Sequence, residues 1–206
     1  MDWKKNEKLE LRNSNKAGLM ENGMKIVIGA GTTKYHGWIH TQENELDLLN
    51  QNSFLRIIPE RDAQCFLAEH VWEHLTYEEG VIAAKNCYDF LRPGGYLRIA
   101  VPDKNFRNEW YQNLVQAGGP GPRDHPAATH KIVYDYRTFS NMLTEAGFDV
   151  SLLEYCDDEG TFRYNYWNSS DGHIGRSFRF DTRNSIEKLG MVSLIADARK
   201  PLMIRA

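Results

Sequence analysis

The chain has 206 residues, of which 41% are hydrophobic and 26% charged, a composition typical of a single globular domain that buries its own core. Its formal net charge of −3 excludes a general attraction to nucleic acid or anionic lipid. The sequence has no run of about 18 apolar residues, so we expect no membrane span. It has no signal peptide, so we expect a cytoplasmic address. Its three cysteines are far apart, so we expect no disulfide framework.

The predicted domain begins with two short strands separated by a glycine turn. Residues 1–23 are polar and predict a lead-in, and the domain proper spans residues 24–206. Residues 24–28 form an apolar, β-branched run that ends in Gly29-Ala30-Gly31, the pattern of a buried strand that feeds a tight turn. A second strand is predicted at 38–41. A parallel crossover usually needs about a dozen residues, so the helix between these strands must be one turn long or missing.

The next segment is predicted to hold a short helix and two strands. Residues 43–50 place three leucines among acidic residues and predict the helix. Residues 54–58 predict a third strand, 59–62 a loop, and 64–68 a buried strand.

A capping box predicts the start of the next helix. Thr76 can cap its N-terminus, and Glu79 stands three residues later. The Pro93-Gly94-Gly95 sequence stops this helix, and residues 96–101 predict a further strand. The apolar face of the helix consists of Val81, Ala84, Cys87, Tyr88 and Leu91.

The last third of the chain predicts two helices and two strands around an insertion. The helices are expected at 106–116 and 136–147, with Gly147 ending the second. The closing strands are expected at 150–155 and 192–198. Between them, residues 156–190 are rich in aromatic, Arg, Asp and Gly residues and predict a hairpin and loop.

This order of elements predicts an α/β fold. We expect a Rossmann-like, open and mostly parallel sheet with helices on both faces, an antiparallel closing strand and an insertion between the last two strands. Ligands of such sheets bind at the carboxyl ends of the strands, so residues that directly follow strands are the candidates for function.

The first candidate is the glycine turn. Gly29 and Gly31 let the backbone turn sharply and approach a ligand without a Cβ in the way. The third glycine of the dinucleotide fingerprint is absent, because Lys34 stands there, which argues against a nicotinamide oxidoreductase. After the second strand, Gln42 occupies the position of the acid that commonly binds ribose hydroxyls. Its amide can also bind a hydroxyl, without the charge.

The second candidate is the segment Glu69-His70-Val71-Trp72-Glu73-His74, just beyond a buried strand. On a helix His70 and His74 would share one face, where zinc could bind. The order is not that of the H-E-x-x-H metalloproteases, and the sequence offers no obvious third ligand. We therefore predict no metal and favour polar contacts to a ligand, with a metal-dependent hydrolase as a weaker alternative.

Together these segments resemble the class I S-adenosylmethionine-dependent methyltransferases. They are most similar to a small bacterial group with a G-x-G turn, a G-W-I strand, an E-H-V-x-E-H segment and L-x-P-G-G-x-L-R-I-x-V-P-D. The resemblance covers roughly residues 24–155 and the last strand. The matching positions are Gly29, Gly31, 37–39, 69–74, 91–103 and 145–148. Gln42 and the abbreviated first crossover depart from the general pattern.

The resemblance implies that S-adenosylmethionine is the cofactor. By position, Gly29, Ala30 and Gly31 would cradle its methionine part, and Gln42 its ribose. Glu69 and His70 would lie near the methyl group. Asp47 and Asp62 each fit the adenine contact in some register, and the sequence does not choose between them.

The residues that contact the methyl acceptor are expected in the parts of the chain that do not share the family's motifs. Substrate contacts are predicted for His74, Tyr134, Trp167 and Arg179, and the insertion is predicted to form a lid or pocket wall. If a general base exists, His70 is the first candidate and His130 the second.

The acceptor is expected to be a small polar molecule, and nucleic acid is disfavoured by the acidic balance of charge. A non-catalytic binding protein on the same fold is the main alternative, and homo-oligomerisation is left open.

Overall fold

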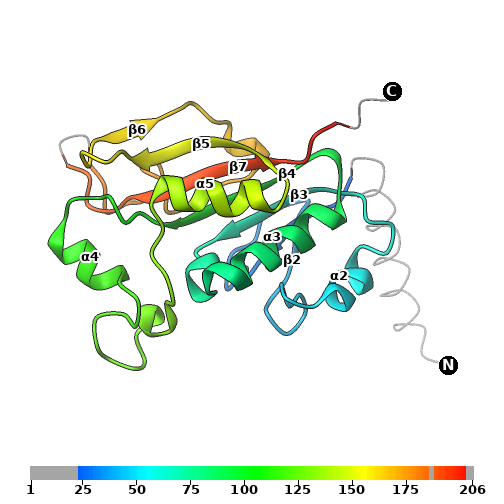
Figure 1. Ribbon diagram of the computed structural model, residues 1–206, viewed down its shortest axis with the longest axis horizontal. Coiled ribbons are helices and arrows are strands. Elements are labelled where there is room, and N and C mark those ends of the chain that lie inside the picture. The colour runs from blue at the N-terminus through cyan, green and yellow to red at the C-terminus, as the bar shows by residue number, and fades with distance from the viewer. Residues whose placement is uncertain (1–22, 186–187, 203–206) are drawn as a thin grey trace.

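The computed structural model describes residues 23–185 and 188–202, and residues 1–22 of the predicted lead-in (1–23) lie outside them. These residues form a seven-stranded mixed sheet with the order β2-β1-β3-β4-β7-β5-β6 (Figure 1). The strands are β1 (Lys25–Ile28), β2 (Ile39–His40), β3 (Ala63–Glu69), β4 (Leu91–Pro102), β5 (Asp149–Cys156), β6 (Phe162–Tyr164) and β7 (Ser193–Arg199).

The sheet has a parallel half and an antiparallel half. Strands β2, β1, β3 and β4 pair in parallel, whereas β7 is antiparallel to β4 and β5, and β6 is antiparallel to β5. The predicted open sheet, its antiparallel closing strand and the hairpin that begins the insertion are therefore confirmed. The ten residues between β1 and β2 form turns instead of a helix, as their short spacing predicted.

The prediction of a third strand at 54–58 is wrong. Residues 54–57 belong to helix α2 (Gln51–Ile57) and Ile58 is its C-cap, while Asn50 caps the other end by accepting a hydrogen bond from the Asn52 N–H. Phe54 is fully buried, with its ring 5.9 Å from that of Phe66 and 5.0 Å from that of Phe90. Phe54, Ile57 and Ile58 follow helical spacing, which places all three toward the sheet.

The helix predicted at 43–50 is also wrong, because this segment forms turns. Leu46 and Leu48 are both buried although they are two residues apart. In a helix, two residues at this spacing would lie on different faces. The Asp47 Oδ1 accepts a hydrogen bond from the Leu49 N–H and stabilises the turn.

Helices α2, α3 (Tyr77–Phe90) and α5 (Tyr136–Glu145) pack on one face of the sheet, where they share the main hydrophobic core (Figure 1). The predicted capping box of α3 is confirmed, because Thr76 Oγ1 accepts from the Glu79 N–H while the Glu79 carboxylate accepts from the Thr76 N–H. Helix α4 (Glu109–Val115) is shorter than predicted and starts after its cap Asn108. It packs in a separate small cluster with Met191.

Helices were predicted on both faces of the sheet, but the other face is covered differently. Among the described residues it is covered by the segment 165–181, whose helical element is the 3₁₀ helix η3 (Ser169–Asp171). Trp167 and Ile174 from this segment bury Leu67, Ala100 and Ile195 of the sheet. The insertion thus takes the place of helices on this face.

None of the helices in the described part of the chain is long and apolar enough to cross a membrane.

Candidate functional site

Three adjoining cavities lie at the carboxyl ends of β1, β3 and β4. The glycine cavity, of about 430 Å³, is lined by Gly29, Gly31, Glu69 and His130 among others. The leucine cavity, also about 430 Å³, is lined by Gln42, Asp47 and the three leucines 46, 48 and 49. The arginine cavity, about 190 Å³, is lined by Tyr111, His125, Arg176, Asp181 and Arg183. His70 lines all three, so the cavities form one cleft around this residue.

The glycine turn opens the cleft. Gly29 and Gly31 have φ values of 59° and 54°, in the left-handed region that side chains with a Cβ rarely adopt. A Cβ on Gly31 would meet no atom within 4 Å, whereas one on Gly29 would lie 2.9 Å from Val71 Cγ2. Gly31 therefore offers open space to a ligand, and Gly29 is needed for the packing of the turn itself.

Gln42 braces this turn. Its Nε2 donates to the Gly31 carbonyl at 2.8 Å, and its Oε1 accepts from the Gly31 N–H at 3.2 Å. The side chain also lines the leucine cavity. The predicted ribose contact stays a prediction, but half of the amide's hydrogen-bonding capacity is already used within the protein.

His70 occupies a strained position where β3 ends. Its φ is 56°, an unusual value for a residue with a side chain, and its N–H donates to the Ala100 carbonyl at 2.9 Å. Its Nδ1 lies 2.9 Å from Glu73 Oε1, and its Nε2 lies 3.0 Å from Ser193 Oγ. Both ring nitrogens are therefore engaged by the protein.

Glu73 lies beneath the cleft in the 3₁₀ helix η1 (Trp72–His74), and it is fully buried. Burial disfavours its charge, but the neighbouring His70 and His74 imidazoles outweigh this effect and lower the pKa of Glu73. Its Oε1 lies 2.9 Å from His70 Nδ1, in ion-pair contact, whereas its Oε2 has no hydrogen-bond partner among the described residues. A buried carboxylate in this state needs a further partner.

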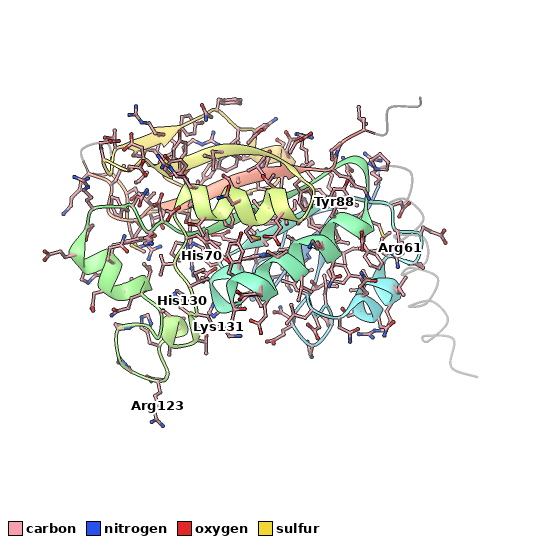
Figure 2. The ribbon with its side chains drawn as sticks, viewed as in Figure 1. Arg61, His70, Tyr88, Arg123, His130 and Lys131 are labelled. Atoms are coloured by element: carbon pink, nitrogen blue, oxygen red, sulfur yellow. The ribbon has the colours of Figure 1, made fainter. Side chains whose placement is uncertain are left out.

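His74 and His130 complete a cluster around this carboxylate. Their rings meet edge to face at 4.9 Å between centroids. His130 Nδ1 contacts the Val115 carbonyl at 2.8 Å, and its Nε2 lies 4.0 Å from Glu73 Oε1. Burial, aided by the His74 imidazole, lowers the pKa of His130 despite the nearby Glu73, so the neutral ring is favoured. Figure 2 shows His70 and His130 on the same side of the molecule, beyond the start of α3.

Glu69 holds the insertion against the cleft. Its carboxylate oxygens accept hydrogen bonds from the backbone N–H groups of Arg176, at 2.7 Å, and Gly175, at 3.0 Å. Both residues line the glycine cavity, so the insertion supplies one wall of the cleft. The predicted cofactor contact of Glu69 stays a prediction, alongside this structural role.

Several predicted substrate residues are not brought to the cleft. Tyr134 is fully buried in the main core, and Trp167 is buried against the sheet, where its Nε1 donates to Glu154 Oε1. Arg179 lies 4.3 Å from the Trp167 ring centroid and donates to the Trp167 carbonyl, outside the three cavities. Of the four predicted, His74 alone lines them. Asp47 reaches the leucine cavity, whereas Asp62 precedes β3, at its opposite end.

Other cleft residues were missed or left without a role. Ser193, the first residue of β7, contacts His70 and donates through Oγ to the Arg176 carbonyl. Arg183 and Tyr111 line the arginine cavity. Sequence spacing offered no signal for these residues, since Ser193 reaches the cleft through the pairing of β7 with β4, and Tyr111 and Arg183 reach it from α4 and the insertion.

The fold and the position of the cleft define a class: the Rossmann-like fold of the class I methyltransferases. A methyltransferase from Archaeoglobus fulgidus, described as dependent on S-adenosylmethionine, is similar over 94% of both chains, with a TM-score of 0.51 and 15% identity.

A possible histamine N-methyltransferase from Thermotoga maritima shares 14% identity, with a TM-score of 0.49 over 86% of this chain and 82% of its own. A methyltransferase from Bacillus halodurans, described as putative, shares 14%, with a TM-score of 0.46 over 91% and 99%. No protein-family model matches the chain, and no curated protein matches its sequence. At 15% identity, the similarity to the Archaeoglobus fulgidus protein shows the fold alone.

Proposed function

We propose that this protein is an S-adenosylmethionine-dependent methyltransferase with a small polar acceptor. The observation that carries the proposal is the open glycine turn. Gly31 faces a cavity at the carboxyl end of β1 and leaves free the space that a Cβ would enter. In sheets of this class, ligands bind at that place.

The donor groups around the cleft fit the cofactor. The glycine cavity would take the methionine part against Gly29, Ala30 and Gly31. The leucine cavity, which shares Ile28, Gly29 and His70 with it, offers an apolar wall of leucines for the adenine ring and polar groups at Gln42 and Asp47 for the ribose. The bound cofactor would supply a methyl group on a sulfonium, which is already a strong electrophile.

The protein's own residues would then act mainly by positioning and by excluding water. The insertion, held by Glu69, closes one side of the cleft. The arginine cavity would take the acceptor, and its Arg176, Arg183 and Asp181 side chains favour a polar molecule. Because both nitrogens of His70 are engaged, we place acceptor activation at His130, whose Nε2 has no hydrogen-bond partner among the described residues.

Calorimetric titration of the purified chain with S-adenosylmethionine and S-adenosylhomocysteine tests the proposal. We expect both to bind at micromolar concentrations. Absence of binding of either at millimolar concentration contradicts it.

The Gly31→Asn variant tests the site. Asn tolerates the left-handed backbone, and its side chain would enter the glycine cavity, so the affinity should fall at least about tenfold. Gly37→Asn is the matched control: Gly37 also has a positive φ and open space around a Cβ, but it does not line the cavity. Equal affinities in the two variants would place the cofactor elsewhere.

A further inference from the structure

Among the described residues, one cluster has the donor set of a metal site. Glu73, His74 and His130 each offer a ligand atom within 4.8 Å of the others. The sequence provided two of these residues in one segment, and the fold adds His130 from 56 positions further along the chain. All three line the glycine cavity, so an ion bound by them could reach a ligand there.

The buried carboxylate independently indicates a missing partner. Glu73 is fully buried. Its Oε1 lies 2.9 Å from His70 Nδ1 and 4.0 Å from His130 Nε2, and its Oε2 has no hydrogen-bond partner among the described residues. Since His130 Nδ1 contacts a carbonyl and must carry the proton there, Nε2 of the neutral ring presents a lone pair to the carboxylate. A cation between these two electron-rich atoms would stabilise both.

The outer contacts of both imidazoles match those of metal ligands. His130 Nδ1 contacts the Val115 carbonyl and His74 Nδ1 contacts Thr129 Oγ1, each at 2.8 Å. Metal-binding histidines usually donate their second ring nitrogen in this way, which fixes the ring and leaves the other nitrogen for the ion. The Glu73 carbonyl also accepts from the Lys131 N–H at 2.7 Å, so the backbone holds the two segments together.

We propose that Glu73, His74 and His130 bind one divalent first-row transition-metal ion, such as Zn²⁺, in the wall of the cleft. Two imidazoles and one carboxylate suit such an ion better than Mg²⁺, which prefers oxygen ligands. Donors on one Zn²⁺ lie roughly 3.4 Å apart in tetrahedral geometry, so the three side chains need only a small closure. The protein ligands leave an open coordination position toward the glycine cavity.

The ion would activate an oxygen of an acceptor that extends from the arginine cavity past His130 to this position, by lowering the pKa of a bound hydroxyl. It would replace the free His130 imidazole as the activating group. This use of the ion rests on the proposed methyl transfer, whereas the site itself does not.

Metal binding alone tests the site, without cofactor or activity. The full chain, stripped with a chelator and dialysed, is titrated with Co²⁺, with visible absorption as the readout, and then with Zn²⁺ in competition. We expect one Co²⁺ per chain, displaced by Zn²⁺, and much weaker binding of Mg²⁺. No stoichiometric Co²⁺ or Zn²⁺, or a preference for Mg²⁺, overturns the proposal.

Variants locate the ion. His74→Ala and His130→Ala should each weaken Co²⁺ affinity by at least roughly 100-fold, since loss of outer-shell partners alone often costs 10–100-fold. His36→Ala, at an exposed histidine outside the cluster, should bind as the unmodified chain does. His74 is only partly buried, so His74→Ala should fold even if a variant of Glu73 does not. Full affinity in folded His74→Ala and His130→Ala overturns the assignment.

Discussion

Asp103 follows the end of β4 and carries a carboxylate that the fold buries completely. Its oxygens accept hydrogen bonds from the backbone N–H groups of Cys156, at 2.6 Å, and Asn105, at 2.8 Å. Burial nevertheless dominates and raises the pKa of Asp103 to about 6. The folded protein therefore binds a proton at this residue in a pH range where the unfolded chain does not.

This raised pKa predicts a residue-specific pH dependence of stability. The contribution of Asp103 is fully present below the unfolded pKa of about 3.9 and is lost as the pH rises through about 6. Lowering the pH from about 7.5 to about 5 should therefore stabilise the unmodified chain by roughly 1.4 kcal/mol more than Asp103→Asn, which cannot titrate. Urea denaturation of both proteins at the two pH values measures this difference. Parallel pH profiles would contradict it.

The site residues that the sequence predicted are those close to strand ends. Gly29, Gly31, Glu69 and His70 directly follow or end β1 and β3, so the general geometry of parallel sheets locates them. Tyr134 and Trp167 could not be assigned this way, because an aromatic residue in a loop serves equally well as core or as pocket wall. Their burial depends on long-range packing that local sequence does not express.

At the level of elements, capping and periodicity predicted α3 and α5 well, because both start at side-chain caps and bury a regular stripe. The segment 54–58 was misread as a strand because a short apolar run suits either structure. Its Asn50 cap and the helical spacing of Phe54, Ile57 and Ile58 were the signals that distinguish them.

The insertion can cover one face of the sheet in place of helices because charged side chains of the sheet form hydrogen bonds with the insertion, including its backbone groups. Arg98 on β4 forms a two-point ion pair with Asp197 on β7, at 2.7 and 2.8 Å. Its remaining nitrogen donates to the Asn168 and Gly172 carbonyls. Glu154 likewise accepts from Trp167 Nε1 and the Phe178 N–H. A buried loop without such partners would be costly.

Arg98→Met should therefore destabilise the protein by about 3–5 kcal/mol, since it leaves the buried Asp197 without its partner. Urea denaturation provides the measurement. Arg137→Met is the matched control, because Arg137 on α5 pairs with Asp158 and both side chains are exposed, so solvent screens the charges. Its midpoint should stay near that of the unmodified chain. Similar losses in both variants would show that the Arg98 pair does not anchor the insertion.

Considered as a whole, the molecule assembles its glycine cavity from four distant parts of the chain: residues 27–35 around the glycine turn, the segment 67–74, the segment 126–130 and the insertion at 175–176. The first two contain the ends of parallel strands, and the third is held just after its end by the Glu73 carbonyl. The insertion is joined to β3 by the Glu69 carboxylate. The Glu69 side chain thus couples the cover of one sheet face to the cavity at its edge.

Glu69→Gln should uncouple these two parts. The Gln amide nitrogen cannot accept a hydrogen bond, so one of the two backbone donors at 175–176 loses its partner. A hydrogen bond to a charged group contributes about 1.5–3 kcal/mol, so amide exchange at these residues should accelerate roughly 10- to 100-fold, as hydrogen–deuterium exchange can measure. Glu78→Gln, at an exposed position in the first turn of α3, should leave this exchange unchanged. If Glu69→Gln also retains the exchange rates of the unmodified chain, the insertion is held by its aromatic packing, and the cleft wall does not depend on Glu69.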